Sequence, residues 1–322
     1  MDFQSSYKQW IRYLIVFVGV VAVLVVFFRT LLIAPTDFPV PYRLTIEPGQ
    51  TLFSVSRELT DDSVIRSPRL FEIFMIALGS EKKVSEGEYY FAQPVSSFEI
   101  ALRISGRQFG IDRKKVTFPE GFTNKQMATR LAQTFDSFDT SLFLTLANEY
   151  EGYLFPDTYG FFPSVTPDAI VVTLRRNFTT KIASLEKDIA VSSRSKKDLI
   201  IMASIIEKEA RGENDRTIIS GILWKRIDSG IPLQVDAPFL YLLGKESKDL
   251  TRADLAINSP YNTYKNKGLP PAPIGNPGLA SIEAALYPES SPYLYYLHDD
   301  DRAIHYAKTY TEHKKNIAQY LR

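Results

Sequence analysis

Apolar residues form an uninterrupted run near the start of the chain. Residues 13–28 read YLIVFVGVVAVLVVFF and contain no charged side chain. A helix of this run, at about 1.5 Å per residue, is shorter than a bilayer core of about 30 Å, but extension to Ala34 makes it long enough. We therefore predict a single N-terminal transmembrane helix over residues 13–34, with a tail over residues 1–12 and a proline-containing linker over residues 35–41.

The residues that flank this run decide between an uncleaved anchor and a cleaved signal peptide. A signal peptide has a shorter apolar region and small residues at its cleavage site, and the segment FFRTLLIAPTDFP offers no convincing site. Lys8 and Arg12 precede the run and favour a cytoplasmic N-terminus, although only weakly, since Arg29 and Arg43 follow it. We expect an anchor, with the remainder of the chain tethered on the far side of the membrane.

A small module is expected after the linker, over residues 42–110. Apolar and polar residues alternate over residues 42–46, which predicts a strand, and Pro48 and Gly49 supply the turn that follows it. Two helices are predicted next, the second over residues 68–78, before the strand-like segment EGEYYF. The expected order is therefore strand, helix, helix, strand.

The remaining residues, 111–322, predict a larger mixed α/β domain, so that the whole chain falls in the α+β class. Thr123 and Gln126 have the spacing of a capping box at the start of a helix. The most apolar helix reads KKDLIIMASIIEKEARG, and Asp198 is a suitable N-cap for it. Since this helix is apolar on nearly all sides, we expect it to be buried.

Glu207 lies on the continuation of the buried stripe of this helix. A desolvated carboxyl group has a raised pKa and keeps a proton near neutral pH, as a general acid requires. The alternative is that Glu207, Lys208 and Glu209 mark the point where the helix emerges into solvent. A glycosidase usually needs two carboxylates, and spacing alone does not choose the second. The candidates are Glu209, Glu213, Asp236, Asp157 and Glu151.

Composition excludes several kinds of chemistry. The 322 residues are 45% hydrophobic and 23% charged, with a formal net charge of +1, so nothing indicates nucleic-acid binding. The absence of cysteine excludes disulfides, thiolate zinc sites and a cysteine nucleophile. The three histidines lie close to the C-terminus and form no HExxH motif, so we expect no metal site, no cofactor and no Ser-His-Asp triad.

Two polar motifs follow the apolar helix. The segment IPLQVDAP places Gln234 and Asp236 on one face of an expected short strand. The segment SPYNTYKNKGLPPAPIGNPG contains Tyr261, Asn262 and Tyr264 before prolines and glycines that stiffen a loop. Amide, carboxylate and tyrosine side chains together are typical of saccharide sites, but a structural loop with satisfied polar groups explains them equally well.

Six ordered motifs resemble those of the MltG (YceG-like) endolytic murein transglycosylase family. They are EGYLFPDTY, ASIIEKEA, LQVDAP, SPYNTY, GLPPAPIGNPG and SPYLYYL, behind one N-terminal membrane anchor. The resemblance covers nearly the whole chain. It implies that residues 42–110 are a LysM-like βααβ subdomain and that residues 111–322 are the catalytic domain. It also implies a single-pass protein of the cytoplasmic (inner) membrane, with the N-terminus in the cytoplasm and the catalytic domain in the periplasm or otherwise outside the cytoplasm.

The resemblance implies cleavage of the MurNAc-β-1,4-GlcNAc bond in nascent glycan strands, with formation of a 1,6-anhydroMurNAc end. Glu207 matches the family's catalytic glutamate, the first Glu of the ASIxEKE motif. The substrate's own 6-hydroxyl group is the nucleophile, so Glu207 serves as acid and then as base, and no second catalytic carboxylate is needed. Such cleavage limits strand length beside the membrane peptidoglycan synthases, which the resemblance suggests as partners.

The same motifs supply the candidate binding residues. Expected to line a saccharide cleft are Gln234, Asp236, Tyr261, Asn262 and Tyr264, and Glu209 is expected to support these residues. The competing hypothesis is a non-catalytic peptidoglycan-binding scaffold that uses the same cleft and the LysM-like module. The intact motif around Glu207 favours the enzyme. A metallohydrolase is a third and more distant alternative.

Overall fold

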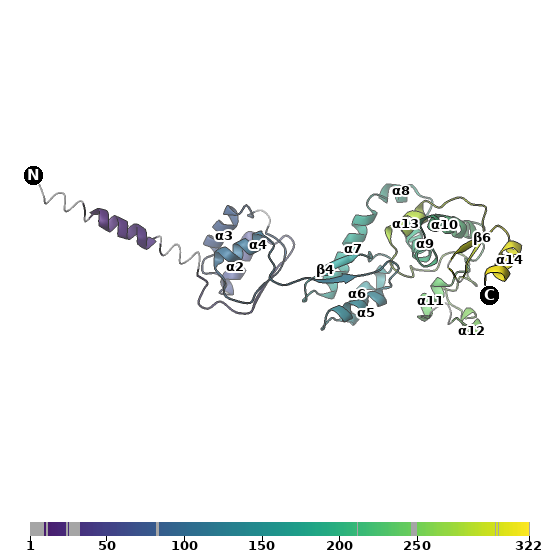
Figure 1. Cartoon of the computed structure of the whole chain (residues 1–322), viewed down its shortest axis with the longest axis horizontal. Coiled ribbons are helices and arrows are strands. Elements are labelled where there is room, and N and C mark those ends of the chain that lie inside the picture. Colours follow the sequence, from purple (N-terminus) through teal and green to yellow (C-terminus); the bar gives the residue numbers. More distant parts are fainter. Residues whose placement is uncertain are drawn as a thin grey trace, which may run out of the picture. The chain divides into compact units, whose positions relative to one another are not determined.

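The computed structural model divides the chain into two compact units, which are described one at a time. The N-terminal unit is Met1–Arg113 and the C-terminal unit is Lys114–Arg322 (Figure 1). The structure describes residues 10, 12–23, 25, 33–81, 84–210, 212–245, 250–299, 301 and 303–321.

The predicted transmembrane segment, residues 13–34, falls partly outside the described residues. Residues 12–23 and 25 are helical, whereas residues 24 and 26–32 are not described. Among the residues that the structure describes, no helix is both long enough and apolar enough to span a bilayer. Most of the predicted tail, residues 1–9 and 11, is likewise outside the described part.

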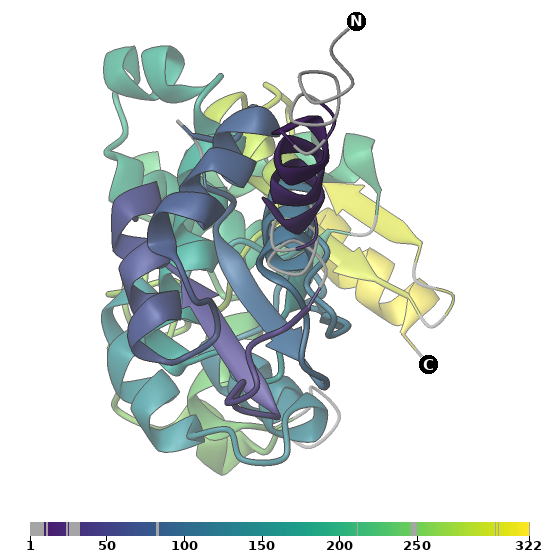
Figure 2. The ribbon, with the colours of Figure 1, turned by 90° about the vertical axis from the view of Figure 1, so that its left-hand side faces the viewer.

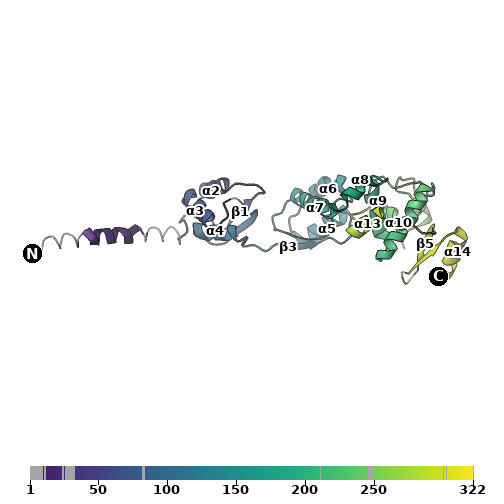
Figure 3. The same ribbon diagram turned by 90° about the horizontal axis from the view of Figure 1, so that it is seen from above.

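The folded part of the N-terminal unit is a two-stranded sheet with three helices. Strands β1 (Tyr42–Ile46) and β2 (Gly87–Phe91) pair antiparallel, with Leu44 opposite Tyr89. Helices α2 (Leu52–Asp61) and α3 (Pro68–Ala77) connect them, and α4 (Ser97–Ser105) follows β2 (Figure 3). The order strand, helix, helix, strand agrees with the sequence pattern. The assignment of this unit to a LysM-like class stays a prediction.

Local signals begin each helix of this unit, and one apolar core holds them together. The side chains of Thr51, Ser67 and Ser96 each accept a hydrogen bond from a backbone N–H three residues further on, which satisfies a free donor at the helix N-terminus. The core consists of buried side chains from both strands and all three helices. Among its fully buried members are Leu44, Val55, Leu59, Phe71, Tyr89 and Phe91.

The first half of the C-terminal unit pairs a second small sheet with helices. Strands β3 (Lys114–Thr117) and β4 (Thr158–Phe161) are antiparallel. Between them lie α5 (Asn124–Thr134), α6 (Thr140–Ala147) and the 3₁₀ helix η1 (Asn148–Tyr150). The capping box predicted for α5 is confirmed, because the Thr123 side chain accepts from the Gln126 N–H and the Gln126 side chain accepts from the Thr123 N–H.

Helices dominate the rest of the C-terminal unit. After β4 come α7 (Pro167–Ile182), α8 (Glu186–Val191), α9 (Lys196–Glu209), α10 (Glu213–Asp228) and α11 (Ala237–Leu243). The small antiparallel sheets among many helices agree with the predicted α+β class.

A third hairpin closes the chain. The short helix α12 (Arg252–Leu255) and the helix α13 (Leu279–Leu286) precede it. Strands β5 (Tyr295–His298) and β6 (Ile304–Ala307) are antiparallel, and α14 (Tyr310–Tyr320) packs against both of them, as the yellow elements in Figure 2 show.

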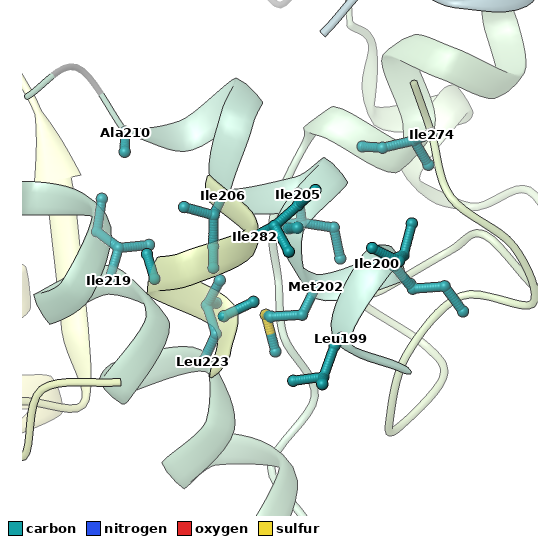
Figure 4. Packing of buried hydrophobic residues seen from close by; sticks show 14 of the residues in the cluster. Leu199, Ile200, Met202, Ile205, Ile206, Ala210, Ile219, Leu223, Ile274 and Ile282 are labelled. Carbon is teal, nitrogen blue, oxygen red and sulfur yellow. The ribbon is translucent and has the colours of Figure 1, made fainter. Parts of the chain in front are cut away.

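Helix α9 is the centre of the larger core of the C-terminal unit. Every residue from Leu199 to Ile206 is buried, and α13 and α10 pack around them (Figure 4). Each fully buried Leu, Ile or Met side chain contributes roughly 1.5–3 kcal/mol to the free energy of folding. The predicted burial of this helix is therefore confirmed. Its start is corrected: Ser195, not Asp198, is the N-cap and accepts from the Asp198 N–H, so the helix begins at Lys196.

Candidate functional site

A cleft of about 1430 Å³ lies in the C-terminal unit. Its wall combines the C-terminal end of α9, the loop before α11, α11 itself, the start of α5 and the β5–α14 region. Polar and charged side chains in the wall include Gln126, Glu151, Lys208, Glu209, Arg226, Gln234, Asp236, Tyr241, Tyr264, Tyr296, His298 and His313.

Gln234, Asp236 and Tyr264 lie together in the wall of this cleft. The Tyr264 hydroxyl donates to Oδ1 of Asp236 at 2.7 Å, and Nη2 of Arg226 donates to Oε1 of Gln234 at 2.6 Å. The expected short strand is wrong, because residues 231–235 form no strand and Gln234 has a φ of +55°. A left-handed conformation at a non-glycine residue costs on the order of 1 kcal/mol or more. This conformation turns the Gln234 side chain away from the direction that a strand would give it.

Glu209 lines the same cleft, on the last turn of α9. The Tyr296 hydroxyl donates to its Oε2 at 3.1 Å. Burial, together with the charge of Glu209, raises the pKa of Tyr296 well above its ordinary value. Tyr296 therefore stays a hydrogen-bond donor to Glu209 over the whole physiological pH range.

Tyr261 and Asn262 are not among the described residues that line the cleft. Asn262 is fully buried: its Nδ2 donates to the carbonyl oxygens of Leu255 and Ile257, and its Oδ1 accepts from the Tyr264 N–H at 3.0 Å. It thus shapes the loop that presents Tyr264. The ring of Tyr261 packs behind the cleft wall against Tyr241, at 5.7 Å between ring centroids.

Glu207 faces away from Glu209, because two residues correspond to about 200° of rotation in a helix. Its side chain is only 7% exposed. Oε2 accepts from the Gly278 N–H at 2.9 Å, at the start of α13, and Oε1 lies 3.7 Å from Nη2 of Arg216. Glu207 is not among the lining residues of the cleft, although the next residue, Lys208, is.

A second carboxyl group, Glu120, approaches the same helix start and was missed by the sequence reasoning. A Cβ atom at position 278 would overlap the Glu120 carboxyl group, so this group lies directly against Gly278. Partial burial and the charge of Glu207 raise the pKa of Glu120, and Arg216 opposes the rise. In the sequence, the turn at Pro119–Gly121 after β3 was the only sign that Glu120 has a special position. The tertiary fold places this turn beside the start of α13.

Glu151 is a half-buried carboxyl group of the cleft. Asn124 N–H donates to its Oε1 at 3.1 Å and the Tyr241 hydroxyl to its Oε2 at 3.3 Å. Burial raises the pKa of Glu151 to about 7, although these two hydrogen bonds and the charge of Lys208 act against the rise. At neutral pH both the protonated and the ionised form of Glu151 are therefore populated.

The other carboxylates considered from the sequence have different surroundings. Asp157 accepts from the Thr158 N–H and from Asn177, and Lys181 lies 3.4 Å away, so that its pKa is lowered despite partial burial. The side chain of Glu213 is outside the described part. The described residues contain no group of three or more His, Asp or Glu side chains arranged to hold a metal ion.

The fold and this site define an α+β protein whose cleft is lined by carboxylates, tyrosines and amides at the end of a buried helix. The sequence model of the YceG-like family matches residues 44–319. The chain belongs to the YceG-like family, and the resemblance seen in its motifs is thereby confirmed.

Relatives and a solved structure give the same picture. The endolytic murein transglycosylase of Bacillus subtilis (strain 168) is 29% identical over 312 residues, which cover 88% of this chain and 86% of that protein. The protein of the same name from Streptococcus pneumoniae serotype 2 is 28% identical over 244 residues, 64% of this chain and 44% of the relative. The crystal structure of a YceG-like protein from Listeria monocytogenes has a TM-score of 0.59 and 29% identity, covering 85% of this chain and 99% of that one.

Proposed function

We propose that this protein is an endolytic lytic transglycosylase that cuts the glycan strands of peptidoglycan. The observation that carries the proposal is the end of α9, where Glu207 is held almost fully buried beside a polar cleft. The Bacillus and Streptococcus relatives named as endolytic murein transglycosylases support the same activity. The aromatic and amide side chains of the cleft suit a saccharide chain, since they stack on sugar rings and bind hydroxyl groups.

In the proposed reaction Glu207 acts on the MurNAc-β-1,4-GlcNAc bond. It gives its proton to the bridging oxygen as the bond from C1 of MurNAc to that oxygen breaks. The 6-hydroxyl oxygen of the same MurNAc then bonds to C1, and the Glu207 carboxylate accepts the hydroxyl proton. The residue returns to its starting state, no water is consumed, and the product carries a 1,6-anhydro ring.

The contacts of Glu207 fit the second half of this cycle. The Gly278 N–H and Arg216 stabilise the carboxylate that must accept the hydroxyl proton. The side chain is 7% exposed, so the proposal requires that substrate binding open a path between this carboxyl group and the glycosidic oxygen. Catalytic hydrogen bonds often reach their working geometry only in the complex with substrate.

Four cleft residues are proposed to hold the strand. Gln234, Asp236, Tyr264 and Glu209 line the cleft and offer donors and acceptors to sugar hydroxyl and acetamido groups. Tyr261 and Asn262 are proposed to support them, since Asn262 positions the backbone N–H of Tyr264.

The location of the enzyme is part of the same proposal. A single-pass anchor over residues 13–34 would hold the C-terminal unit on the periplasmic face of the cytoplasmic membrane. There it would meet nascent strands beside the peptidoglycan synthases. The N-terminal unit, with its strand-helix-helix-strand order, would act as a LysM-like glycan-binding module.

The first test uses the purified full-length chain and uncrosslinked glycan strands, with product ends identified by mass spectrometry. The wild type should release fragments one water lighter than hydrolysis products. Glu207→Gln removes the transferable proton and should reduce cleavage at least about 10³-fold while the strands still bind. Glu149→Gln, the same change on an exposed residue of η1, serves as the control and should cleave normally.

Two other results would change the assignment. Strands that bind to the wild type but remain intact would favour the scaffold without catalysis. Activity that disappears with a metal chelator would favour a metallohydrolase.

A further inference from the structure

Asn276 is the point at which three separate segments of the C-terminal unit meet. Its side chain is fully buried, and Oδ1 accepts from the backbone N–H groups of Gly152 and Leu154, both at 2.9 Å. Nδ2 donates to the Phe122 carbonyl oxygen and to Oδ1 of Asn124, both at 3.0 Å. A buried amide bonded to this extent fixes the three segments relative to one another.

The same amide is tied to the carboxyl group of Glu151. Nδ2 of Asn276 lies 3.2 Å from Oε1 of Glu151. The Asn124 N–H and the Tyr241 hydroxyl also donate to this carboxyl group. A carboxylate can accept from all three donors, whereas a protonated carboxyl group gives up part of its accepting capacity to its own O–H. Nδ2 of Asn276 has two hydrogens for three oxygen acceptors, and an ionised Glu151 competes for them more strongly than a protonated Glu151.

The loop that contains Asn276 also carries the hydrogen-bond donor of Glu207. Two residues after Asn276, the Gly278 N–H donates to Oε2 of Glu207 at 2.9 Å. The backbone of Asn276 is itself bound to the turn before α5. Its carbonyl oxygen accepts from the Gly121 N–H at 2.7 Å, and the Asn276 N–H donates to the Phe122 carbonyl oxygen at 2.9 Å. The position of the Gly278 N–H thus depends on how firmly Asn276 is held.

We propose that Glu151 is a positioning residue for Glu207: its carboxylate fixes Asn276, and Asn276 fixes the Gly278 N–H that orients the Glu207 carboxyl group. The inference rests on the proposed function, in which Glu207 is the catalytic residue. Glu151 also lines the cleft, so a glycan strand bound there would lie beside the carboxylate that holds Asn276.

The proposal makes activity depend on the proton of Glu151. Burial raises its pKa to about 7, so ionisation and protonation are balanced near neutral pH. Above this pH the carboxylate holds Asn276, and below it the proton weakens that contact. Activity should therefore fall as the pH falls through about 7.

Neighbouring charges set the position of this transition. Among the described residues, the titratable groups that face Glu151 are Lys208 of α9, Tyr241 of α11 and Tyr261 of the loop after α12. Burial lowers the pKa of Lys208, and the charges of Glu207 and Glu151 oppose this shift. Burial raises the pKa of both tyrosines, which stay neutral around pH 7. The pKa of Glu151, about 7, places its own titration in the tested range.

The test compares the full-length wild type with Glu151→Gln on uncrosslinked glycan strands, from about pH 5.5 to about pH 9. Gln has the shape of a protonated Glu and does not ionise. We expect its kcat to lie about 10- to 100-fold below the wild-type value at alkaline pH, with KM nearly unchanged and no transition near pH 7. The kcat values of the two proteins should converge at acid pH. Glu149→Gln, at an exposed position two residues away, should keep the wild-type profile.

A second variant separates positioning from a general structural role. Tyr241→Phe removes a hydrogen bond that lowers the pKa of Glu151, so the transition should move to higher pH.

The inference is overturned if Glu151→Gln retains the wild-type profile, if it loses activity but keeps the transition, or if Tyr241→Phe leaves the transition in place. Cleavage by the wild type that Glu207→Gln abolishes and Glu151→Gln does not alter would overturn this inference alone. No cleavage by the wild type would overturn the proposed function with it.

Discussion

Neighbouring carboxyl groups near the end of α9 have distinct environments, and these environments assign their chemistry. Glu207 accepts a hydrogen bond from the Gly278 N–H and lies 3.7 Å from the guanidinium group of Arg216. Glu209 accepts from the Tyr296 hydroxyl in the cleft. Burial raises the pKa of both Glu120 and Glu151, so these two groups bind protons more readily than an exposed glutamate. Residue type alone would have given all four the same role.

The buried position of Glu151 predicts a pH-dependent loss of stability. Its pKa rises from 4.5 in the unfolded chain to about 7 in the folded protein. The folded state therefore binds the proton more tightly than the unfolded chain does. The resulting stabilisation of the folded state is complete below pH 4.5 and is lost as the pH rises to about 7. The loss amounts to at most about 3 kcal/mol.

Glu151→Gln should remove this dependence. The variant is expected to be more stable than the wild type at pH 8, and the difference should shrink below about pH 5. Urea unfolding of the C-terminal unit at both pH values measures the two free energies. A variant that is equally destabilised at both pH values would contradict the prediction.

At the scale of elements, α9 combines a local start signal with burial that only the fold supplies. Ser195 caps its first turn, and α10 and α13 cover its apolar residues. Burial of the apolar residues against α10 and α13 fixes the rotation of the helix about its axis, and this rotation directs Glu207 to α13 and Glu209 to the cleft.

Ser195→Ala should destabilise the C-terminal unit by about 1 kcal/mol, because the Asp198 N–H loses its acceptor. Chemical denaturation measures the change. Ser193→Ala is the matched control: Ser193 is exposed and lies just before the cap, so its substitution should leave the unfolding midpoint within error. Equal effects of the two substitutions would show that the cap is unimportant.

At the scale of the whole molecule, each unit has apolar clusters made only of its own residues. Among the described residues, one cluster belongs to the N-terminal unit, and two belong to the C-terminal unit, around α9 and around the β3–β4 sheet. Because burial of apolar surface is the main source of stability, units with separate cores are expected to unfold separately.

Phe71→Ala tests this independence. Phe71 is fully buried in the N-terminal core, so its truncation should cost about 3–5 kcal/mol there. Calorimetry of the full-length chain should show one transition moved to lower temperature and the other unchanged. Ile205→Ala, in the core around α9, should have the converse effect. A shift of both transitions by either variant would contradict separate unfolding.

The sequence by itself determined what depends on near neighbours along the chain. The capping box of α5, the strand-helix-helix-strand order after residue 42 and the buried helix at 196–209 follow from local hydrogen bonding and from apolar spacing. Its motifs also determined the family, because ordered residues can be compared without a structure.

Only the tertiary structure decided which polar groups meet. Glu120, Gly278 and Glu207 are far apart in sequence, and the fold brings them to one helix start. Gln234 adopts a left-handed conformation that no strand pattern predicts, since contacts to Arg226 and the Thr263 backbone hold it. Hydrogen bonds and desolvation act over a few ångströms in space, so a carboxyl group's charge is fixed by neighbours that sequence distance does not reveal.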